Sequence, residues 1–217
     1  MKKTFTISIF VRCVIFLVKG IWVRDVTGLE NLPKNEPFII APNHSSYMDH
    51  FIVGSIILQY LKKKLYFIAK KEHFEGVSQK SWHRLWNNCI TYIPIDRSKG
   101  EEALKTTLSY LKHGGVIVIY PEGTRSLTGK IQKGKTGVAR LALWAKVPVV
   151  PVGIMGTFEI LPKGKNIPGM KKATLHFGKP LYFNIDHNKK ITKSLLRKIT
   201  GQIMKEIAKL SNQKYNF

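Results

Sequence analysis

The sequence predicts an α/β domain with a largely parallel central sheet flanked by helices, preceded by an N-terminal helix at a membrane interface. Two observations lead to this fold class. Short apolar runs alternate with segments of helical periodicity from residue 38 to residue 178, an order typical of strands joined by covering helices. The first 25 residues are instead dominated by one long apolar stretch. We therefore divide the chain into a membrane-associated helix, 1–25, and an α/β domain, 26–217.

The N-terminal apolar stretch covers residues 5–23, which is close to the roughly 20 residues that span a bilayer. It contains Arg12 and Lys19, however, and a charge near the middle of a spanning helix costs about 2.5–3.5 kcal/mol. On a helical wheel these two residues share one narrow stripe with Thr4 and Ser8, while the remaining surface is apolar. This pattern favours a helix that lies in the membrane interface with its basic side chains at the headgroups. The alternative is a terminal helix packed on the protein's own core.

The elements of the α/β domain follow from its hydrophobic patterning. The expected strands are 38–41, 65–69, 90–95, 116–120, 147–154 and 173–178. The expected helices are 50–63, 80–89, 101–114, 136–146 and the amphipathic 191–210. Residues 28–37, rich in Gly, Asn and Pro, form a connecting turn region.

Composition limits the class of partner without choosing one. The 217 residues are 44% hydrophobic, enough for one domain with a full core, and carry 36 Lys and Arg against 13 Asp and Glu. The formal net charge of +23 attracts nucleic acid, an anionic membrane or phosphorylated substrates, and would also suit a basic soluble protein. Cys13 and Cys89 lie in or beside apolar runs with no disulfide or metal-type spacing, which fits a reducing compartment.

The segment NHSSYMDH, residues 43–50, follows a buried strand and precedes a helix, and ligands bind at the carboxyl ends of such strands. A turn that enters the helix can fold Asp49 back beside His44. A carboxylate on Nδ1 fixes the tautomer and leaves Nε2 to accept a proton. Other readings are a helix cap, a hydrolase nucleophile at Ser45 or Ser46, and a metal site built from His44, Asp49 and His50.

Two further strand ends carry cations. Arg97 and Lys99 follow the strand 90–95 and precede a helix, a position that suits a phosphate, although a solvated turn would also explain either residue. The segment YPEGTRS, residues 120–126, places Glu122 and Arg125 around a flexible Gly123, and an arginine there can grip a phosphate through two parallel hydrogen bonds.

Residues 129–136, GKIQKGKT, match the phosphate-loop pattern GxxxxGK[ST] of nucleotide triphosphatases. In that motif the first glycine comes directly after a strand, whereas here the preceding strand ends near Tyr120. We interpret the segment instead as a basic rim formed by Lys130, Lys133 and Lys135, with Thr136 starting a helix.

Taken together, four blocks in order resemble the glycerolipid acyltransferase family, which includes the 1-acylglycerol-3-phosphate acyltransferases. The blocks are NHSSYMD (43–49), YIPIDR (92–97), PEGTRS (121–126) and VPVVPVGI (147–154). The resemblance extends from about residue 28 to residue 180. One departure is that Ile131 and Gln132 precede the Lys133-Gly134 pair, where the family often has an aromatic residue.

The resemblance implies transfer of a fatty acyl group from a thioester, acyl-CoA or acyl carrier protein, to the sn-2 hydroxyl of 1-acyl-sn-glycerol 3-phosphate, giving phosphatidic acid. It makes His44 the base that deprotonates the hydroxyl and Asp49 the residue that orients it, with no metal, no cofactor and no covalent intermediate. The substrate-binding residues that it implies are Lys71, Arg97, Glu122, Gly123, Thr124, Arg125 and Ser126, with the three cations on the acceptor's phosphate.

The expected partners are anionic membrane lipids, lysophosphatidic acid and the thioester donor, at the cytoplasmic face of the inner (plasma) membrane. Rival acceptors are another lysophospholipid, a lyso-ornithine lipid or glycerol 3-phosphate. A nucleic-acid-binding protein is the reading from a different class, but the basic residues are spread along the chain and no recognition motif is present. A third hypothesis is a peripheral membrane protein that has kept the fold but has no enzymatic activity.

Overall fold

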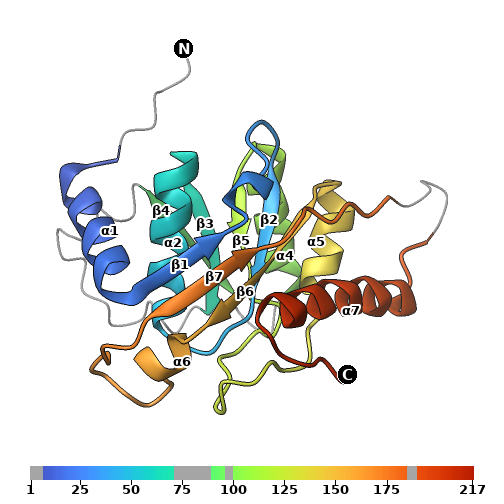
Figure 1. Cartoon of the computed structure of the whole chain (residues 1–217). Helices are drawn as coiled ribbons and strands as arrows, with labels where there is room; N and C mark the ends of the chain where they lie inside the picture. The colour runs from blue at the N-terminus through green and yellow to red at the C-terminus, as the bar shows by residue number, and fades with distance from the viewer. Residues whose placement is uncertain (1–6, 71–88, 96–99, 185–189) are drawn as a thin grey trace.

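The computed structural model describes residues 7–70, 89–95, 100–184 and 190–217. Within these ranges the strands form one seven-stranded sheet in the order β1-β7-β6-β2-β5-β3-β4 (Figure 1). The strands are β1 (Val23–Thr27), β2 (Phe38–Pro42), β3 (Leu65–Lys70), β4 (Ile90–Ile95), β5 (Val116–Val118), β6 (Val149–Met155) and β7 (Ala173–Phe177). The helices are α1 (Ile9–Trp22), α2 (Met48–Leu61), α4 (Gly100–Lys112), α5 (Gly137–Ala145), α6 (Thr157–Ile160) and α7 (Lys193–Leu210), with a 3₁₀ turn at Leu29–Asn31.

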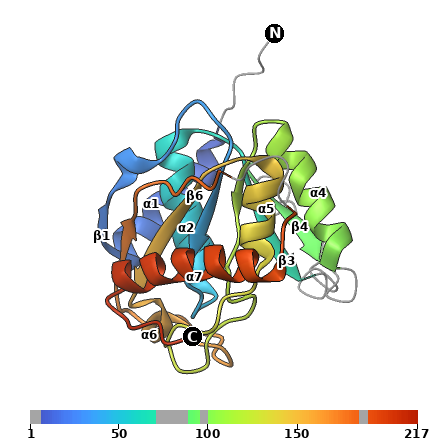
Figure 2. The ribbon, with the colours of Figure 1, turned by 90° about the vertical axis from the view of Figure 1, so that its right-hand side faces the viewer.

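Helices cover both faces of the sheet, so the central strands are buried on both sides and read as continuous apolar runs. Successive residues of β2 alternate between two cores: Phe38 and Ile40 pack in the core that includes α1 and α2, whereas Ile39 packs in the core that includes α4, α5 and α7. Figure 2 shows the second layer, with α7 lying across the view and α4 and α5 beside it.

Strand direction places the ends of the central strands at one edge. β2 pairs in parallel with β5 and β6, and β3 pairs in parallel with β4 and β5, so the carboxyl ends of these five strands share the edge drawn at the bottom of Figure 1. β7 runs antiparallel to β6, and β1 runs parallel to β7. The prediction of a largely parallel sheet flanked by helices is therefore confirmed.

Helix α1 has two apolar faces, and only one of them is covered. Val11, Ile15 and Val18 are buried in the core shared with α2. On the outward face, Ile9 and Phe16 are 80% and 77% exposed. The packing of one face on the protein's own core agrees with the alternative reading of this segment, while its position at a membrane interface stays a prediction. No helix in the described part of the chain is long and apolar enough to cross a membrane.

Most predicted elements match the observed ones within a few residues, with three differences. Strand β1 was not expected: it follows α1 directly and pairs with β7 at the far end of the chain. β5 ends at Val118, although the backbone N–H of Ile119 still donates to Ile40. The short helix α6 was also missed, and the helix expected at 80–89 lies almost wholly outside the described residues. The division of the chain at residue 25 stays a prediction.

Candidate active site

The candidate site begins directly after β2, where Asn43 prolongs the sheet with its side chain. Its Nδ2 donates to the carbonyl of Ile154 at 2.9 Å, and the backbone N–H of Ile154 donates to its Oδ1 at 2.7 Å. The amide thus satisfies both backbone groups of Ile154, beyond the last residue of β2 that pairs with β6. This pairing holds the chain in place immediately before His44.

His44 and Asp49 are in direct contact, as the turn-into-helix interpretation predicted. Asp49 lies in the first turn of α2 and is completely buried. Its Oδ2 accepts from Nδ1 of His44 at 2.8 Å and from the backbone N–H groups of Ser45 and Ser46 at 2.9 Å each. Within the described residues, its Oδ1 has no hydrogen-bond partner. One carboxylate oxygen therefore binds the imidazole and the backbone of the two residues that follow it.

This geometry determines which ring nitrogen of His44 is available. A carboxylate can only accept hydrogen bonds, so Nδ1 carries the hydrogen and Nε2 presents its lone pair. The ring is 9% exposed and stacks on Tyr120, with centroids 3.9 Å apart and planes 20° apart. The stacking fixes the plane of the imidazole and leaves Nε2 as the group that can take a proton from a substrate.

Two of the three other readings of this turn, the metal site and the hydrolase nucleophile, do not fit the contacts. His50 packs edge-on to His44 at 5.3 Å between ring centroids and also packs on Phe67, and no cluster of three or more His, Cys, Asp or Glu side chains occurs in the described residues. The Ser45 hydroxyl lies 3.2 Å from that of Thr157, while the Ser46 hydroxyl donates to the carbonyl of Leu161 at 2.8 Å. Both hydroxyls thus have structural partners away from the imidazole.

Glu122 follows β5 and binds the turn that carries His44. Its Oε1 accepts from the backbone N–H of His44 at 2.8 Å, and its Oε2 accepts from the backbone N–H and the side-chain amide of Gln132 at 2.9 and 3.3 Å. Burial raises the pKa of this carboxyl to about 7, although the hydrogen bonds from His44 and Gln132 act in the opposite direction. Because both oxygens bind protein groups, Glu122 shapes the site by positioning His44.

The other residues of the PEGTRS segment, 123–126, also contact the turn at His44 or the loop that contains Gln132. Gly123 has a φ of +70°, and an added Cβ would lie 3.0 Å from the side chain of Lys135, so glycine suits the turn. The carbonyl of Thr124 accepts from the side chain of Gln132 at 3.2 Å. The backbone N–H of Ser126 donates to the carbonyl of His44 at 2.8 Å, so the segment is bonded to both backbone groups of His44.

Arg125 supplies a cation beside the imidazole turn. Its guanidinium lies over the ring of Tyr47 at 3.3 Å from the centroid. This stacking fixes the plane of the guanidinium group. Its Nη1 is buried and has no hydrogen-bond partner within the described part of the chain. An unpaired guanidinium N–H at this edge is suited to an anionic ligand. The two other predicted phosphate-binding cations, Lys71 and Arg97, lie outside the described residues.

The phosphate-loop match at 129–136 has a packing explanation. Gly134 lies against α7, where an added Cβ would come within 2.6 Å of Met204, and its carbonyl accepts from Arg197 at 2.9 Å. No described strand directly precedes Gly129, and Thr136 sits at the start of α5. The glycine and its neighbours thus belong to a loop that packs on a helix.

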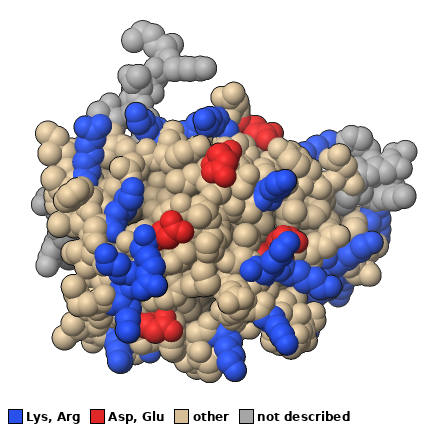
Figure 3. Space-filling model, viewed as in Figure 1, with Lys and Arg blue, Asp and Glu red and all other residues tan. Residues whose placement is uncertain are grey.

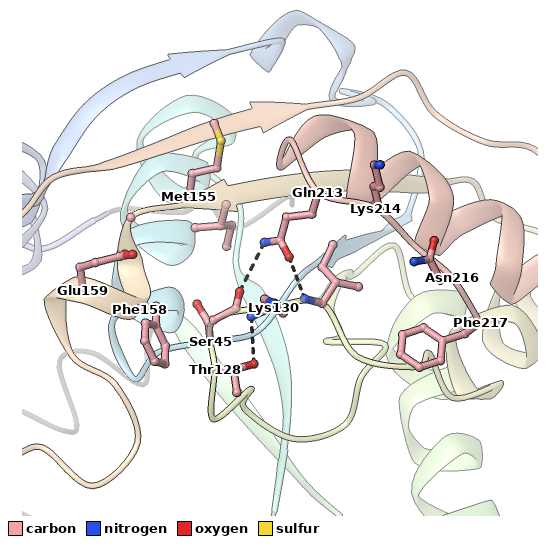
Figure 4. Close-up of a pocket in the computed structure, with 14 residues that line it drawn as sticks. Ser45, Thr128, Lys130, Met155, Phe158, Glu159, Gln213, Lys214, Asn216 and Phe217 are labelled. Atoms are coloured by element: carbon pink, nitrogen blue, oxygen red, sulfur yellow. Dashed lines mark hydrogen bonds between the residues drawn. The ribbon is translucent and has the colours of Figure 1, made fainter.

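A cavity of about 750 Å³ opens beside Ser45, in the turn after β2 (Figure 4). Its lining comes from Ser45, from the loop at 128–131, from the end of β6, from Gly156 and helix α6, and from the segment after α7, where Gln213, Lys214, Asn216 and Phe217 contribute. Gln213 accepts from the backbone N–H of Ile131 at 2.8 Å and donates to the carbonyl of Gly129 at 3.3 Å. Sequence reasoning missed this contribution of the segment after α7, since nothing in its pattern indicates a contact more than 80 positions away.

An α/β sheet with a buried carboxylate–imidazole pair at its carboxyl edge, beside an arginine whose Nη1 has no hydrogen-bond partner in the described residues, suits an enzyme that transfers a group by general-base catalysis. The family model described as Acyltransferase matches residues 23–155, a range that contains His44, Asp49, Glu122 and Arg125. The chain belongs to this acyltransferase family.

Individual relatives agree with this assignment. The 1-acyl-sn-glycerol-3-phosphate acyltransferase of Bacillus subtilis is 32% identical over 189 residues, covering 87% of this chain and 88% of that protein. The chloroplastic 1-acyl-sn-glycerol-3-phosphate acyltransferase BAT2 of Brassica napus is 31% identical over 73% of this chain, which spans only 45% of the plant protein. Among solved structures, the 1-acyl-sn-glycerophosphate (LPA) acyltransferase PlsC of Thermotoga maritima is 27% identical, with a TM-score of 0.65 over 94% of this chain and 81% of that one.

Proposed function

We propose that this acyltransferase moves a fatty acyl group from a thioester to the sn-2 hydroxyl of 1-acyl-sn-glycerol 3-phosphate, giving phosphatidic acid. The observation that carries the chemistry is the 2.8 Å contact between Nδ1 of His44 and Asp49, which leaves Nε2 as a base at the carboxyl edge of the sheet. The names of the relatives from Bacillus and Thermotoga support the choice of acceptor.

The proposed reaction is a single acyl transfer with general-base catalysis. Nε2 of His44 takes the proton of the acceptor hydroxyl as its oxygen attacks the thioester carbonyl. The C–S bond then breaks, and the imidazolium returns the proton to the leaving thiolate. Asp49 stabilises the imidazolium and holds the ring in the required tautomer. General-base catalysis typically supplies about 10²–10⁴-fold, so positioning of the two substrates has to supply the rest. The reaction needs no metal and no resident cofactor.

Arg125 is the proposed ligand of the acceptor's phosphate. Its buried, unpaired Nη1 and the stacking on Tyr47 support this role, because a fixed guanidinium binds phosphate through parallel, charge-assisted hydrogen bonds. Lys71 and Arg97 are proposed to share the phosphate on the strength of the sequence resemblance. Gly123, Thr124 and Ser126 are proposed to shape the same pocket.

The donor is proposed to be acyl-CoA or acyl carrier protein, since either presents the same thioester. The cavity lined by Ser45, the residue after His44, offers space of substrate size, although His44 itself does not line it. The enzyme is further proposed to work at the cytoplasmic face of the inner (plasma) membrane, where its lipid acceptor resides. The outward apolar face of α1 and the formal net charge of +23 support attachment to an anionic bilayer.

The test compares His44→Ala with His50→Ala, which removes the neighbouring imidazole of the same segment. Thioester consumption would be followed with lysophosphatidic acid and acyl-CoA, and with acyl carrier protein as the second donor. We expect His44→Ala to lower turnover by at least about 10³-fold, while His50→Ala stays within about tenfold of the wild type. A folded His44→Ala protein with near-normal turnover would refute the mechanism, and a wild type inactive on lysophosphatidic acid with both donors would refute the acceptor.

A further inference from the structure

The segment between α6 and β7, residues 161–172, displays large apolar side chains within a strongly basic stretch. Ile167 and Met170 are 83% and 79% exposed, among the most exposed large hydrophobic residues of the described chain. Lys163, Lys165, Lys171 and Lys172 are also exposed, and the segment contains no Asp or Glu. Apolar side chains presented between lysines are typical of a surface that contacts an anionic lipid interface.

The backbone of this segment is held in place, so the two apolar side chains are presented by a fixed loop. The backbone N–H of Gly169, which lies between Ile167 and Met170, donates to the carbonyl of Ile160 at 2.7 Å. The indole N–H of Trp22 donates to the carbonyl of Gly169 at 2.9 Å. Both hydrogen bonds anchor the loop from its protein side while Ile167 and Met170 remain outside any core.

The hydrogen bond from Trp22 also ties this loop to the end of α1. In Figure 1 the loop after α6 lies at the lower left, below the end of α1 and next to the edge where the central strands end. Basic side chains gather over the same lower left part of the surface in Figure 3. The loop therefore lies beside the C-terminal end of α1, over a part of the surface where basic side chains gather.

We propose that residues 161–172 form a second membrane contact, in which Ile167 and Met170 enter an anionic lipid surface and the four lysines bind its headgroups. This inference rests on the lipid substrate and membrane attachment proposed above. A single helix lying in the interface leaves the protein free to roll about the helix axis. A second contact beside that axis removes this freedom and fixes which edge of the sheet faces the lipid.

The loop is joined directly to the catalytic turn. The carbonyl of Leu161 accepts from the Ser46 hydroxyl at 2.8 Å and from the backbone N–H of Tyr47 at 3.4 Å. Ser46 also forms a β-bridge with Pro162. Lipid contact at Ile167 and Met170 would therefore bring the turn that carries His44 to the bilayer surface, where a lysolipid can enter without leaving the interface.

The test measures partition onto vesicles of phosphatidylcholine with about one-third phosphatidylglycerol. The variant I167S/M170S is compared with the wild type, with F16S/L17S on α1, and with Y182S, an exposed aromatic residue (61%) outside this surface. We expect I167S/M170S to weaken partition by about tenfold or more, since each buried apolar side chain contributes strongly to interfacial binding, and Y182S to change it by less than twofold. Partition of I167S/M170S within twofold of the wild type would overturn the proposal.

A second measurement separates docking from chemistry. Turnover with a short-chain lysophosphatidic acid, kept below its aggregation concentration, does not require a bilayer. We expect I167S/M170S to match the wild type there and to be slower only with vesicle-borne acceptor. An equal loss in both assays would overturn the docking role, whereas a wild type without any acyl transfer would refute the proposed reaction and leave the partition result to decide the membrane contact.

Discussion

The variant Asp49→Asn isolates the charge of the carboxylate from its geometry. In the native site, Oδ2 of Asp49 accepts all three hydrogen bonds, from His44, Ser45 and Ser46, while Oδ1 has no partner in the described residues. An asparagine can place its single oxygen at the Oδ2 position and its amide at the unpartnered position. The turn and the tautomer of His44 should then survive, and only the negative charge is lost.

The magnitude follows from the separation of the two charges. An imidazolium and a carboxylate about 4 Å apart attract by about 4 kcal/mol at an effective dielectric constant of about 20. In the proposed mechanism the transition state carries a proton on His44, so losing this attraction should lower kcat by about 10³-fold. Removal of the side chain in Asp49→Ala should differ, because it leaves the buried N–H groups of Ser45 and Ser46 without an acceptor, at about 1–3 kcal/mol each.

The assay measures kcat with lysophosphatidic acid and acyl-CoA, together with thermal unfolding of each variant and an intact-mass check that the asparagine has not deamidated. We expect Asp49→Asn to unfold within about 3 °C of the wild type, and Asp49→Ala to unfold at a clearly lower temperature. If Asp49→Asn retained turnover within tenfold of the wild type, the carboxylate would not stabilise an imidazolium. If it unfolded as early as Asp49→Ala, the substitution would not be a test of charge alone.

The remaining two predictions concern the PEGTRS segment. Because burial raises the pKa of Glu122 from 4.5 to about 7, its contribution to stability is complete below pH 4.5 and is lost as the pH rises through 7. The wild type should lose about 3 kcal/mol relative to Glu122→Gln over this range in urea unfolding, and parallel pH profiles would contradict the assignment. Arg125→Lys keeps the charge but loses the fork and the stacking on Tyr47, so KM for lysophosphatidic acid should rise about tenfold with KM for the thioester unchanged. An equal effect with a phosphate-free acceptor would argue against phosphate binding by Arg125.

Much of the fold could be predicted because strands that are buried on both faces of the sheet consist of continuous apolar residues, a pattern that is visible in the sequence. β2, β3 and β4 are continuous apolar runs, and their predicted bounds agree with the observed ones to within one residue. β1 does not show this apolar pattern. It is an edge strand of five residues with Arg24 and Asp25 exposed, and its partner β7 is far away in the chain, so no local periodicity indicates its pairing.

Some features of the candidate site could likewise be predicted from the sequence, and others could not. The placement of His44, Asp49, Glu122 and Arg125 at one edge of the sheet could be predicted, because their motifs follow strands that end at this edge and a motif at a strand end is a local pattern. Their roles in catalysis and binding stay predictions. The role of Glu122 as the acceptor for the backbone of His44 could not be predicted, since sequence does not tell whether a buried carboxyl faces protein or ligand. Gln213 was missed because its contacts are long-range side-chain to backbone bonds. The sequence predicts that α1 is apolar, but it does not indicate which face of the helix packs on the protein.

The contacts of Gln213 and Tyr215 bear on when the enzyme becomes active during synthesis. Gln213 bonds to Gly129 and Ile131, and the Tyr215 hydroxyl accepts from the backbone N–H of Gly134, so these two residues hold the loop whose Gln132 binds Glu122. The ribosome makes the catalytic turn early and these residues late, with a delay of roughly 10–30 s at 5–20 residues per second. A nascent chain can thus carry His44 and the central strands before this loop is held in place, and we expect acyl transfer to follow the docking of Gln213 and Tyr215.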